Sequence, residues 1–519
     1  MALKKHTIPF AETGQFSKLF MNYINGDEKL RSFYTYSPDI SSFGQAIADK
    51  RKEKINRDLL VEVISDQYKS RIKSPLSDFQ ASNSNIEKLL NGNTYTVCTG
   101  HQLCLFTGPL YFIFKIISTI NLAEALRKQY SDCDFVPVYW MASEDHDFEE
   151  ISSVQLFGRK ITWEVPAAGA VGRLKTNSLD KIIDELKQIF GDSENAKALI
   201  QLFSDAYLKH DTLADATRYL VHELFSEDGL VIIDPDDARL KSEFIEIIKD
   251  DIANQTNFKL VSDTIARLNA IGFEAQVNPR EINVFRMTEN NRIRIEQANV
   301  ETLNLKPGEY SPNVVLRPLY QQKILPNLAY VGGPGELAYW LEYKAMFDHH
   351  KILFPVLIPR NFAVLMDEKA LQQLTKLGFT KSDIFKEADV LIKDFVNKST
   401  GSDLSLKEQE QKLALMFGEM AVKVNAVDPS LKASVEAELQ KALGSIKNIE
   451  SKLLRSEKQK QETNISQIKK LKDKFLPGGV LQERHDNMAP YYLKSGKSLI
   501  SELKETFDPF AFEMLVLEL

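Results

Sequence analysis

A polar run able to bind an anion follows the first β-prone segment of the chain, at residues 95–98. The run consists of Thr99, Gly100, His101 and Gln102, and a helical pattern begins soon after it, at Leu110. Glycine lets the backbone approach a ligand, and a helix N-terminus attracts anions with its free N–H groups. The pattern favours a phosphate or carboxylate site, with His101 donating as charge develops in a transition state. A tight turn with a structural histidine is the alternative, because neither GxGxxG nor GxxxxGK[ST] is present.

A second polar group follows the continuous apolar run at 135–141, which is typical of a strand buried on both faces. It consists of Glu144, Asp145, His146 and Asp147. Ligands of open α/β sheets bind at the carboxyl ends of strands, so these side chains are expected at a cleft. Asp145 or Asp147 can orient a substrate or deprotonate an attacking amine. A metal is a further possibility, although a second spaced set of ligands is missing, and a charged helix start is the structural alternative.

The third group is a glycine-rich loop in front of a predicted helix beginning at Leu337. Its members are Gly332, Gly333, Gly335 and Glu336, with Pro334 between them. Bare backbone N–H groups at a helix start suit a nucleotide, phosphate or sugar, whereas Glu336 also fits as a partner for the helix dipole. Two arginines beside prolines, Arg317 and Arg360, can pair bidentately with carboxylates or phosphates or else lie on solvated faces.

These residues need a scaffold that brings strand ends together. The order strand, turn, helix, strand across residues 95–141 is a βαβ pattern and predicts a parallel, Rossmann-like sheet. Further strands are expected at 230–235, within 281–295 and at 353–358. We expect the chain to have five parts. Residues 1–150 should form N-terminal helices and the first half of the core, 151–228 a connecting insertion, and 229–380 the second half of the core with a further small insertion. Residues 381–476 should form a helical hairpin, and 477–519 a segment that returns to the core.

Residues 381–476 carry apolar side chains at helical spacings. Leu413, Phe417 and Val424 mark one helix, Asp428-Pro429 marks a break, and Leu439, Leu443 and Ile446 mark the next. A single second helix of about 70 Å would be too long for a compact domain. The pattern therefore predicts an antiparallel coiled-coil hairpin.

Composition limits the classes of function. The 519 residues include 65 Lys and Arg against 72 Asp and Glu, a net charge of −7, so nucleic acid is disfavoured as the main partner. The three cysteines form no CxxC pair, so no zinc site is evident and a reducing cytoplasm is expected. The most apolar stretch, 103–126, is too polar to cross a membrane, and no secretory signal is visible.

Several motifs, in this order, resemble the family of cysteine-adding ligases of bacillithiol biosynthesis. The matching segments are Thr99–Gln102, Phe106–Tyr111 with Lys115, Pro137–Trp140, Glu144–Phe148, Asn313–Leu319, Gly332–Trp340, Ile358–Arg360 and Leu481–Arg484. The resemblance spans most of the chain. His101 departs from it, because the family often has Gln at this position.

The resemblance implies a Rossmann-like core similar to class I aminoacyl-tRNA synthetases and a coiled coil that forms a homodimer. It implies a ligase that joins cysteine to the amine of glucosaminyl-malate, with ATP and Mg²⁺ inferred from the fold. ATP is expected at the Thr99–Gln102 turn and the Gly332–Gly335 loop, and Arg317 or Arg360 at the malyl carboxylates. Two alternatives are a nucleotide-dependent acyl- or adenylyl-transferase with another amine acceptor, and a non-catalytic coiled-coil partner protein.

Overall fold

The computed structural model describes residues 3–71, 80–400 and 405–519. The chain divides into two compact units. The first comprises Met1–Leu365 and Leu481–Leu519, and the second is Met366–Val480. The last 39 residues therefore return to the first unit.

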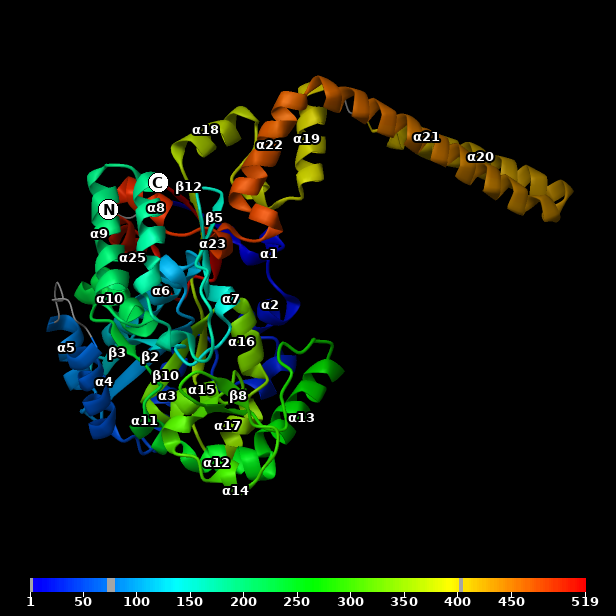
Figure 1. Cartoon of the computed structure of the whole chain (residues 1–519). Coiled ribbons are helices and arrows are strands. Elements are labelled where there is room, and N and C mark those ends of the chain that lie inside the picture. The colour runs from blue at the N-terminus through cyan, green and yellow to red at the C-terminus, as the bar shows by residue number, and fades with distance from the viewer. Residues whose placement is uncertain (1–2, 72–79, 401–404) are drawn as a thin grey trace. The chain divides into compact units, whose positions relative to one another are not determined.

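Five parallel strands form the central sheet of the first unit, in the order β11-β10-β2-β3-β6 (Figure 1). Their bounds are β2 Thr94–His101, β3 Asp134–Met141, β6 Val231–Ile233, β10 Asn327–Gly332 and β11 Val356–Pro359. Starting from β6, the strands rank 3-2-1-4-5 in chain order, so the order reverses between β2 and β10. Sheets of this topology bind ligands at that reversal, outside the carboxyl ends of the strands. The predicted parallel, Rossmann-like core is confirmed.

Strand β2 is longer than the sequence pattern indicates. It pairs with β3 as far as His101 opposite Met141, so Thr99, Gly100 and His101 are strand residues and not a turn. All eight residues of β2 are buried. A central strand covered on both faces continues wherever its neighbour offers backbone partners, even across a glycine. The other strand boundaries differ from the predicted ones by a few residues, and 281–295 contains two strands.

Helices and two insertions connect the strands. Helix α6 (Tyr111–Gln129) joins β2 to β3 and packs with α3 (Ser42–Lys50) against one face of the sheet. The first insertion holds β4 Ser153–Leu156, β5 Arg159–Thr162, α7 Phe148–Ile151, α8 Asp180–Phe190, α9 Glu194–Lys209 and α10 Leu213–Phe225. The second holds α11 Ala238–Ser242, α12 Ile245–Asn254, α13 Thr256–Ala270, α14 Val300–Leu303, α15 Arg317–Ile324 and the sheet of β7 Val284–Met287, β8 Arg292–Arg294 and β9 Tyr310–Pro312. Helices α16 Pro334–Leu341 and α17 Lys344–His350 lead to β11.

The two ends of the chain meet in a second sheet, ordered β1-β13-β12. Its strands are β1 Lys4–Pro9, β12 Phe362–Met366 and β13 Glu513–Glu518. Short helix α23 (Gln482–His485) binds β12 through side chains: Gln482 Oε1 accepts from Leu365 N at 2.8 Å, and Glu483 Oε2 accepts from Ala363 N at 3.0 Å. These bonds anchor the returning segment beside the central sheet.

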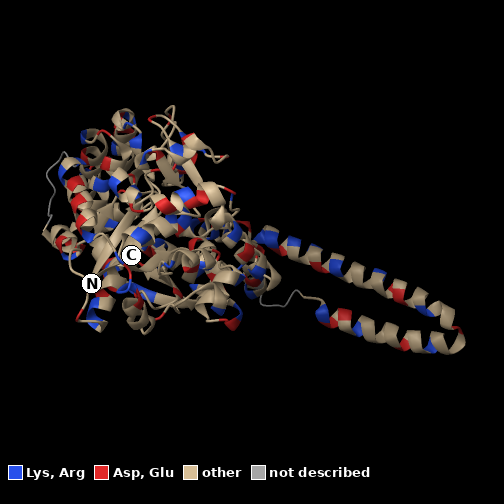
Figure 2. Ribbon diagram, turned by 90° about the horizontal axis from the view of Figure 1, so that it is seen from below, with Lys and Arg blue, Asp and Glu red and all other residues tan. Residues whose placement is uncertain are grey.

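The second unit contains the predicted helical hairpin. Helices α20 (Lys407–Val427) and α21 (Lys432–Lys460) pack on each other, and both basic and acidic residues are scattered along each of them (Figure 2). Neither helix has a buried residue. The expected long second helix is interrupted at Gln461, after which α22 (Glu462–Phe475) packs on α19 (Ala388–Thr400). Residues 457–462 are all good helix formers, although Thr463 and Asn464 are weaker ones, and no Gly or Pro marks this break.

An ion pair between the buried Lys115 and the part-buried Glu336 holds the reversal point of the central sheet together. Lys115 Nζ, on α6, lies 2.8 Å from Glu336 Oε1, on α16, and also donates to Gly100 O at the end of β2. Glu336 further accepts from Tyr330 Oη at 2.6 Å and from Gly333 N at 2.9 Å. The pair thus joins β2, α6, β10 and the glycine loop. Burial opposes ionisation of Glu336, but Lys115, Gly333 N–H and Tyr330 outweigh it and lower its pKa to about 2.

The variant Glu336→Gln should change how stability depends on pH. Because the folded-state pKa lies below the ordinary value of 4.5, the ionised carboxylate stabilises the wild type above about pH 4.5, and that stabilisation is lost as the pH falls towards about 2. At pH 7 the variant leaves Lys115 as an uncompensated buried cation, which costs about 3–5 kcal/mol. We expect its urea midpoint, followed by tryptophan fluorescence, to lie below that of the wild type at pH 7 and the gap between the two midpoints to narrow as the pH falls to 3.

The double variant Lys115→Met/Glu336→Gln is the matched control. Removing both charges should recover part of the stability lost in either single variant, because no buried charge is then unpaired. Strict additivity of the two single effects, or a constant gap between wild type and Glu336→Gln from pH 7 to 3, would contradict this account.

Candidate functional site

A cavity of about 720 Å³ opens at the reversal point, over the carboxyl ends of β2, β3 and β10. Its volume suits a small-molecule site. Four of the predicted groups reach it: the end of β2, the acidic run after β3, the glycine loop and both arginines. A second cavity, of about 990 Å³, lies between α6, α9, α10 and the C-terminal helices and contains none of these groups. The first cavity is therefore the candidate site.

The end of β2 supplies Gly100, His101 and Gln102 to the cavity, whereas Thr99 does not line it. Thr99 Oγ1 donates to Val331 O at 2.8 Å and so ties β2 to β10. At Gly100 an added Cβ would lie 3.2 Å from Arg317 Nη1, so a larger residue here would displace the arginine. Glycine at this position keeps the guanidinium close to the backbone.

His101 is a buried, neutral imidazole. It stacks on Tyr111 with the ring centres 5.1 Å apart and contacts Phe112 edge-on. Burial, with the nearby Lys115 charge, lowers the pKa of His101 to about 3. Its Nε2 atom is buried and has no hydrogen-bond partner in the described part of the chain. At neutral pH the Nε2 atom can therefore form a hydrogen bond with a bound ligand, but the imidazole is a poor base.

Of the four polar residues after β3, three line the cavity and one lies on the surface outside it. Glu144, Asp145 and His146 line the cavity, whereas Asp147 is exposed outside it at the start of α7. Glu144 is buried and pairs with Lys241 at 2.6 Å. His146 Nδ1 lies 3.0 Å from Arg292 Nη1.

Asp145 is fixed by several donors. Gln102 Nε2 donates to its Oδ2 at 2.9 Å, and the His146 backbone N–H donates to its Oδ1 at 2.7 Å. Burial raises the pKa of Asp145, but Gln102, Arg292 and the backbone donors outweigh burial and lower it below the usual range. An ionised carboxylate of this kind is better suited to holding a cationic group than to accepting a proton.

The glycine loop contributes Gly333 and Gly335 to the lining, but not Gly332. An added Cβ at Gly332 would lie 3.0 Å from both Leu337 Cδ2 and Tyr330 Cε1, so its role in the structure is close packing. Glu336 lines the cavity, yet its carboxylate already accepts from Lys115, Tyr330 and Gly333. It therefore fixes the loop and Lys115.

The two arginines differ in how their charges are balanced. Arg360 Nη2 lies 2.5 Å from Glu483 Oε1 in a fully buried pair, and its Nε atom is buried without a partner among the described residues. Arg317 has no carboxylate at ion-pair distance in the described part of the chain, and Tyr339 Oη lies 3.3 Å from its Nη2. Arg317 is thus the freer guanidinium and the better candidate for an anionic ligand.

Sequence patterns alone did not single out several lining residues. Lys115 gave no local signal, because its partner Glu336 is 221 positions away. Arg292 and Arg294 lie at alternate positions of strand β8, a spacing that puts two cations on one face. Of the remaining lining cations, Arg280 was not singled out, and Arg484 was noted only as the last residue of the Leu481–Arg484 motif.

The cavity carries an excess of positive charge although the whole chain is acidic. Six arginines and one lysine line it, against four carboxylates. Such a lining favours anionic ligands such as phosphates and carboxylates. Asp145 is only part-buried, and Arg292 Nη1 lies 3.8 Å from its Oδ1, so a ligand ammonium can still reach the carboxylate.

Two family models match the chain. The first, described as the N-terminal Rossmann-like domain of bacillithiol biosynthesis BshC, covers residues 3–361, and the second, described as the C-terminal coiled-coil domain of BshC, covers residues 363–519.

Curated relatives match over almost their full length. Proteins named "Putative cysteine ligase BshC" from Flavobacterium psychrophilum and Christiangramia forsetii are 40% and 38% identical, over 97% and 98% of both chains. The same name is given to a relative from Bacillus cytotoxicus that is 26% identical over 93% of this chain and 94% of its own.

One solved structure, titled a putative arginyl tRNA synthetase from Campylobacter jejuni, covers 83% of this chain and 100% of its own at 12% identity and a TM-score of 0.21. A likeness this low supports no conclusion about the chain. In the described residues, no helix is both long and apolar enough to span a membrane.

The two matched domains, which together account for nearly every residue, and relatives of 40% and 38% identity place this chain in the BshC family of bacillithiol biosynthesis.

Proposed function

We propose that this protein is a cysteine ligase that joins the carboxyl group of cysteine to the glucosamine amine of glucosaminyl-malate, with ATP and Mg²⁺ driving the reaction. The observation that carries the proposal is the convergence of the β2 end, Asp145, the glycine loop and Arg317 on one cationic cavity. Family membership supplies the reaction class, and the cavity supplies the chemistry that such substrates need.

The amide bond forms between the cysteine carboxyl carbon and the amine nitrogen. Nucleotide activation would convert one carboxylate oxygen into a leaving group, either as an adenylate with release of pyrophosphate or as an acyl phosphate with release of ADP. The ammonium would first lose a proton to solvent. The free amine would then attack the carboxyl carbon, the C–O bond to AMP or phosphate would break, and the second amine proton would also pass to solvent. Phosphate groups suit the cavity wall at Gly100 and Gly335 and the unpartnered nitrogens of His101 and Arg360, whereas the Gly333 N–H is already bound to Glu336.

The proposed acceptor, glucosaminyl-malate, has negative charges at its malyl end and a positive charge at its glucosamine end, and different cavity residues suit each end. Arg317, with Arg292 and Arg294 in the same cavity lining, suits the two carboxylates of the malyl group. Asp145 suits the ammonium form of the glucosamine and orients it towards the activated cysteine. Asp147, exposed and outside the lining, is less suited to that role.

A direct product assay tests this function. Purified protein, cysteine and glucosaminyl-malate are incubated with and without ATP and Mg²⁺, and the thiol product is measured by mass. We expect product only with ATP, accompanied by release of AMP or ADP.

Two outcomes would contradict the proposal. Product formed from another amine but not from glucosaminyl-malate would indicate a transferase with a different acceptor. Absence of nucleotide turnover with every amine tested would favour the non-catalytic partner protein.

The variant Asp145→Asn tests the role of the carboxylate. A hydrogen bond to a charged group contributes about 1.5–3 kcal/mol, so kcat/KM for the acceptor should fall about 10- to 150-fold. Asp263→Asn, on the exposed surface of α13, is the matched control and should leave kcat/KM unchanged. An unchanged Asp145→Asn, or a loss seen in Asp147→Asn alone, would contradict the assignment.

We also propose that the hairpin forms a homodimer. Leu415, Val422 and Ile449 are 70%, 73% and 53% exposed, so apolar surface remains after α20 and α21 have packed together. The triple variant Leu415→Glu/Val422→Glu/Ile449→Glu should sediment as a monomer while still binding nucleotide, whereas Lys423→Glu, exposed on the same helix, should remain a dimer. A wild type that sediments as a monomer would contradict the dimer.

A further inference from the structure

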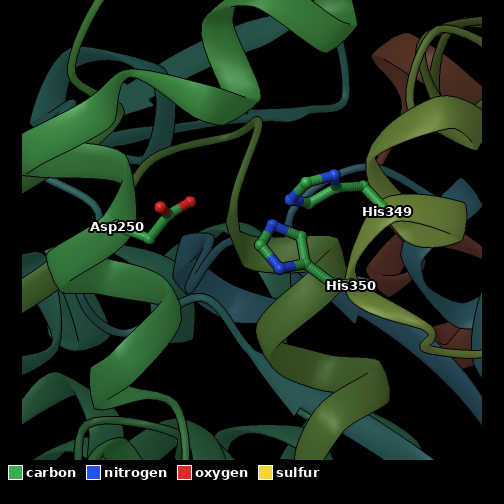
Figure 3. Close-up of side chains that lie close together, drawn as sticks. All are labelled: Asp250, His349 and His350. Atoms are coloured by element: carbon green, nitrogen blue, oxygen red, sulfur yellow. The ribbon is translucent and has the colours of Figure 1, made fainter.

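Three metal-ligating side chains converge away from the cavity (Figure 3). Asp250 comes from α12 in the second insertion, and His349 and His350 form the end of α17 in the core. One ligand atom from each lies within 4.8 Å of the other two. In Figure 3 each imidazole turns a ring nitrogen towards the space between the three side chains. None of the three lines either large cavity.

One carboxylate oxygen of Asp250 accepts a hydrogen bond and the other does not, among the residues that the structure describes. Asn254 Nδ2 donates to Oδ1 at 2.8 Å, one turn along α12. Oδ2 is buried and has no hydrogen-bond partner in the part of the chain that the structure describes. A buried acceptor without a donor is costly, and a bound cation is one way in which proteins satisfy it.

His350 is held ready for a metal by a buried network. Its Nε2 lies 2.9 Å from Asn257 Oδ1, and Asn257 Nδ2 donates to Asp251 Oδ1 at 3.1 Å, which fixes the amide with its oxygen towards the imidazole. Burial and the neighbouring His349 lower the pKa of His350 to about 4. The ring is therefore neutral at pH 7, the form that binds metals.

The donor set indicates the class of ion. Two imidazole nitrogens with one carboxylate oxygen suit Zn²⁺ and its neighbours Co²⁺ and Ni²⁺, whereas Mg²⁺ and Ca²⁺ prefer oxygen ligands alone. Ligand atoms at Zn²⁺ bond lengths of about 2.0–2.2 Å lie about 3–3.5 Å apart. The three ligand atoms lie within 4.8 Å of one another, so the side chains must move closer when they bind an ion, and His349 is exposed.

We propose that Asp250, His349 and His350 form a binding site for a divalent transition-metal ion, with Zn²⁺ as the best match, that clamps the second insertion to the Rossmann-like core. The site is structural, because its ligands lie outside the cavity. It does not depend on the proposed function.

The clamp lies at one end of a hydrogen-bonded chain that reaches the cavity. Asp251, adjacent to Asp250, accepts from Asn283 N at 2.6 Å, and Asn313 Nδ2 donates to Asn283 Oδ1 at 3.0 Å. Asn313 lines the cavity, and its carbonyl accepts from Arg317 N at 2.9 Å at the start of α15. Fixing α12 against α17 thus also fixes the segment that carries Arg317.

Metal binding to the full-length protein tests the site without an activity assay. Chelator-treated, dialysed protein is titrated with Co²⁺ and followed by the visible absorption of Co²⁺ in a low-coordinate protein site, and Zn²⁺ is then added as a competitor. We expect one Co²⁺ per chain, displacement by Zn²⁺ but not by Mg²⁺, and a melting temperature a few degrees higher with Zn²⁺.

The variants His349→Ala, His350→Ala and Asp250→Asn should each weaken Zn²⁺ binding at least tenfold and abolish the thermal shift. His6→Ala, which removes an exposed histidine on β1, is the matched control and should bind as the wild type does. His349 is exposed, so its variant should fold normally, and far-ultraviolet circular dichroism checks this.

Two results would overturn the proposal. The first is failure of the wild type to take up Zn²⁺ or Co²⁺. The second is equal uptake by the wild type and by His349→Ala/Asp250→Asn, which would place the metal elsewhere, for example at the three cysteines that all these variants retain.

Discussion

The buried pair between Lys115 and Glu336 is the constraint on which the site depends. Each charge, taken alone, would be too costly to leave in the interior, so the two residues must be placed together. Their shared contacts reach Gly100 O on one side of the reversal point and Gly333 N on the other. The backbone that borders the cavity is therefore fixed by the same interaction that makes burial of the pair tolerable.

Other ion pairs extend this organisation around the cavity. Glu144 is held by Lys241, and Arg360 by Glu483 from the returning C-terminal segment. These pairings leave Arg317 and Asp145 as the cation and the carboxylate best placed to meet a ligand. A ligand with carboxylates at one end and an ammonium at the other would match that arrangement of charges, as the proposed acceptor does.

Much of the core could be predicted from the sequence because its signals are local. The apolar runs at 135–141 and 353–358, each ending in polar residues, indicate buried parallel strands without knowledge of their partners. The motifs that reach the cavity follow from the rule that ligands bind at strand ends. The antiparallel hairpin followed from apolar spacing and the Asp428-Pro429 break.

The parts of the site that could not be predicted from the sequence depend on contacts between residues that are far apart along the chain. Glu483 meets Arg360 from 123 positions away, and Asp250 meets His349 only because α12 and α17 are neighbours in space. A search for paired cysteines misses a cluster of this kind. Asp145 and Asp147 look equivalent in the sequence, and only the direction of the loop separates the lining residue from the exposed one.

Hydrogen–deuterium exchange with and without glucosaminyl-malate and ATP tests most directly whether the substrates bind in the cavity at the reversal point. Slower exchange at residues 100–102 and 333–336, with no change around the second cavity at 198–228, is the result that this account predicts. Protection at 198–228 with none at the strand ends of β2 and β10 would contradict it.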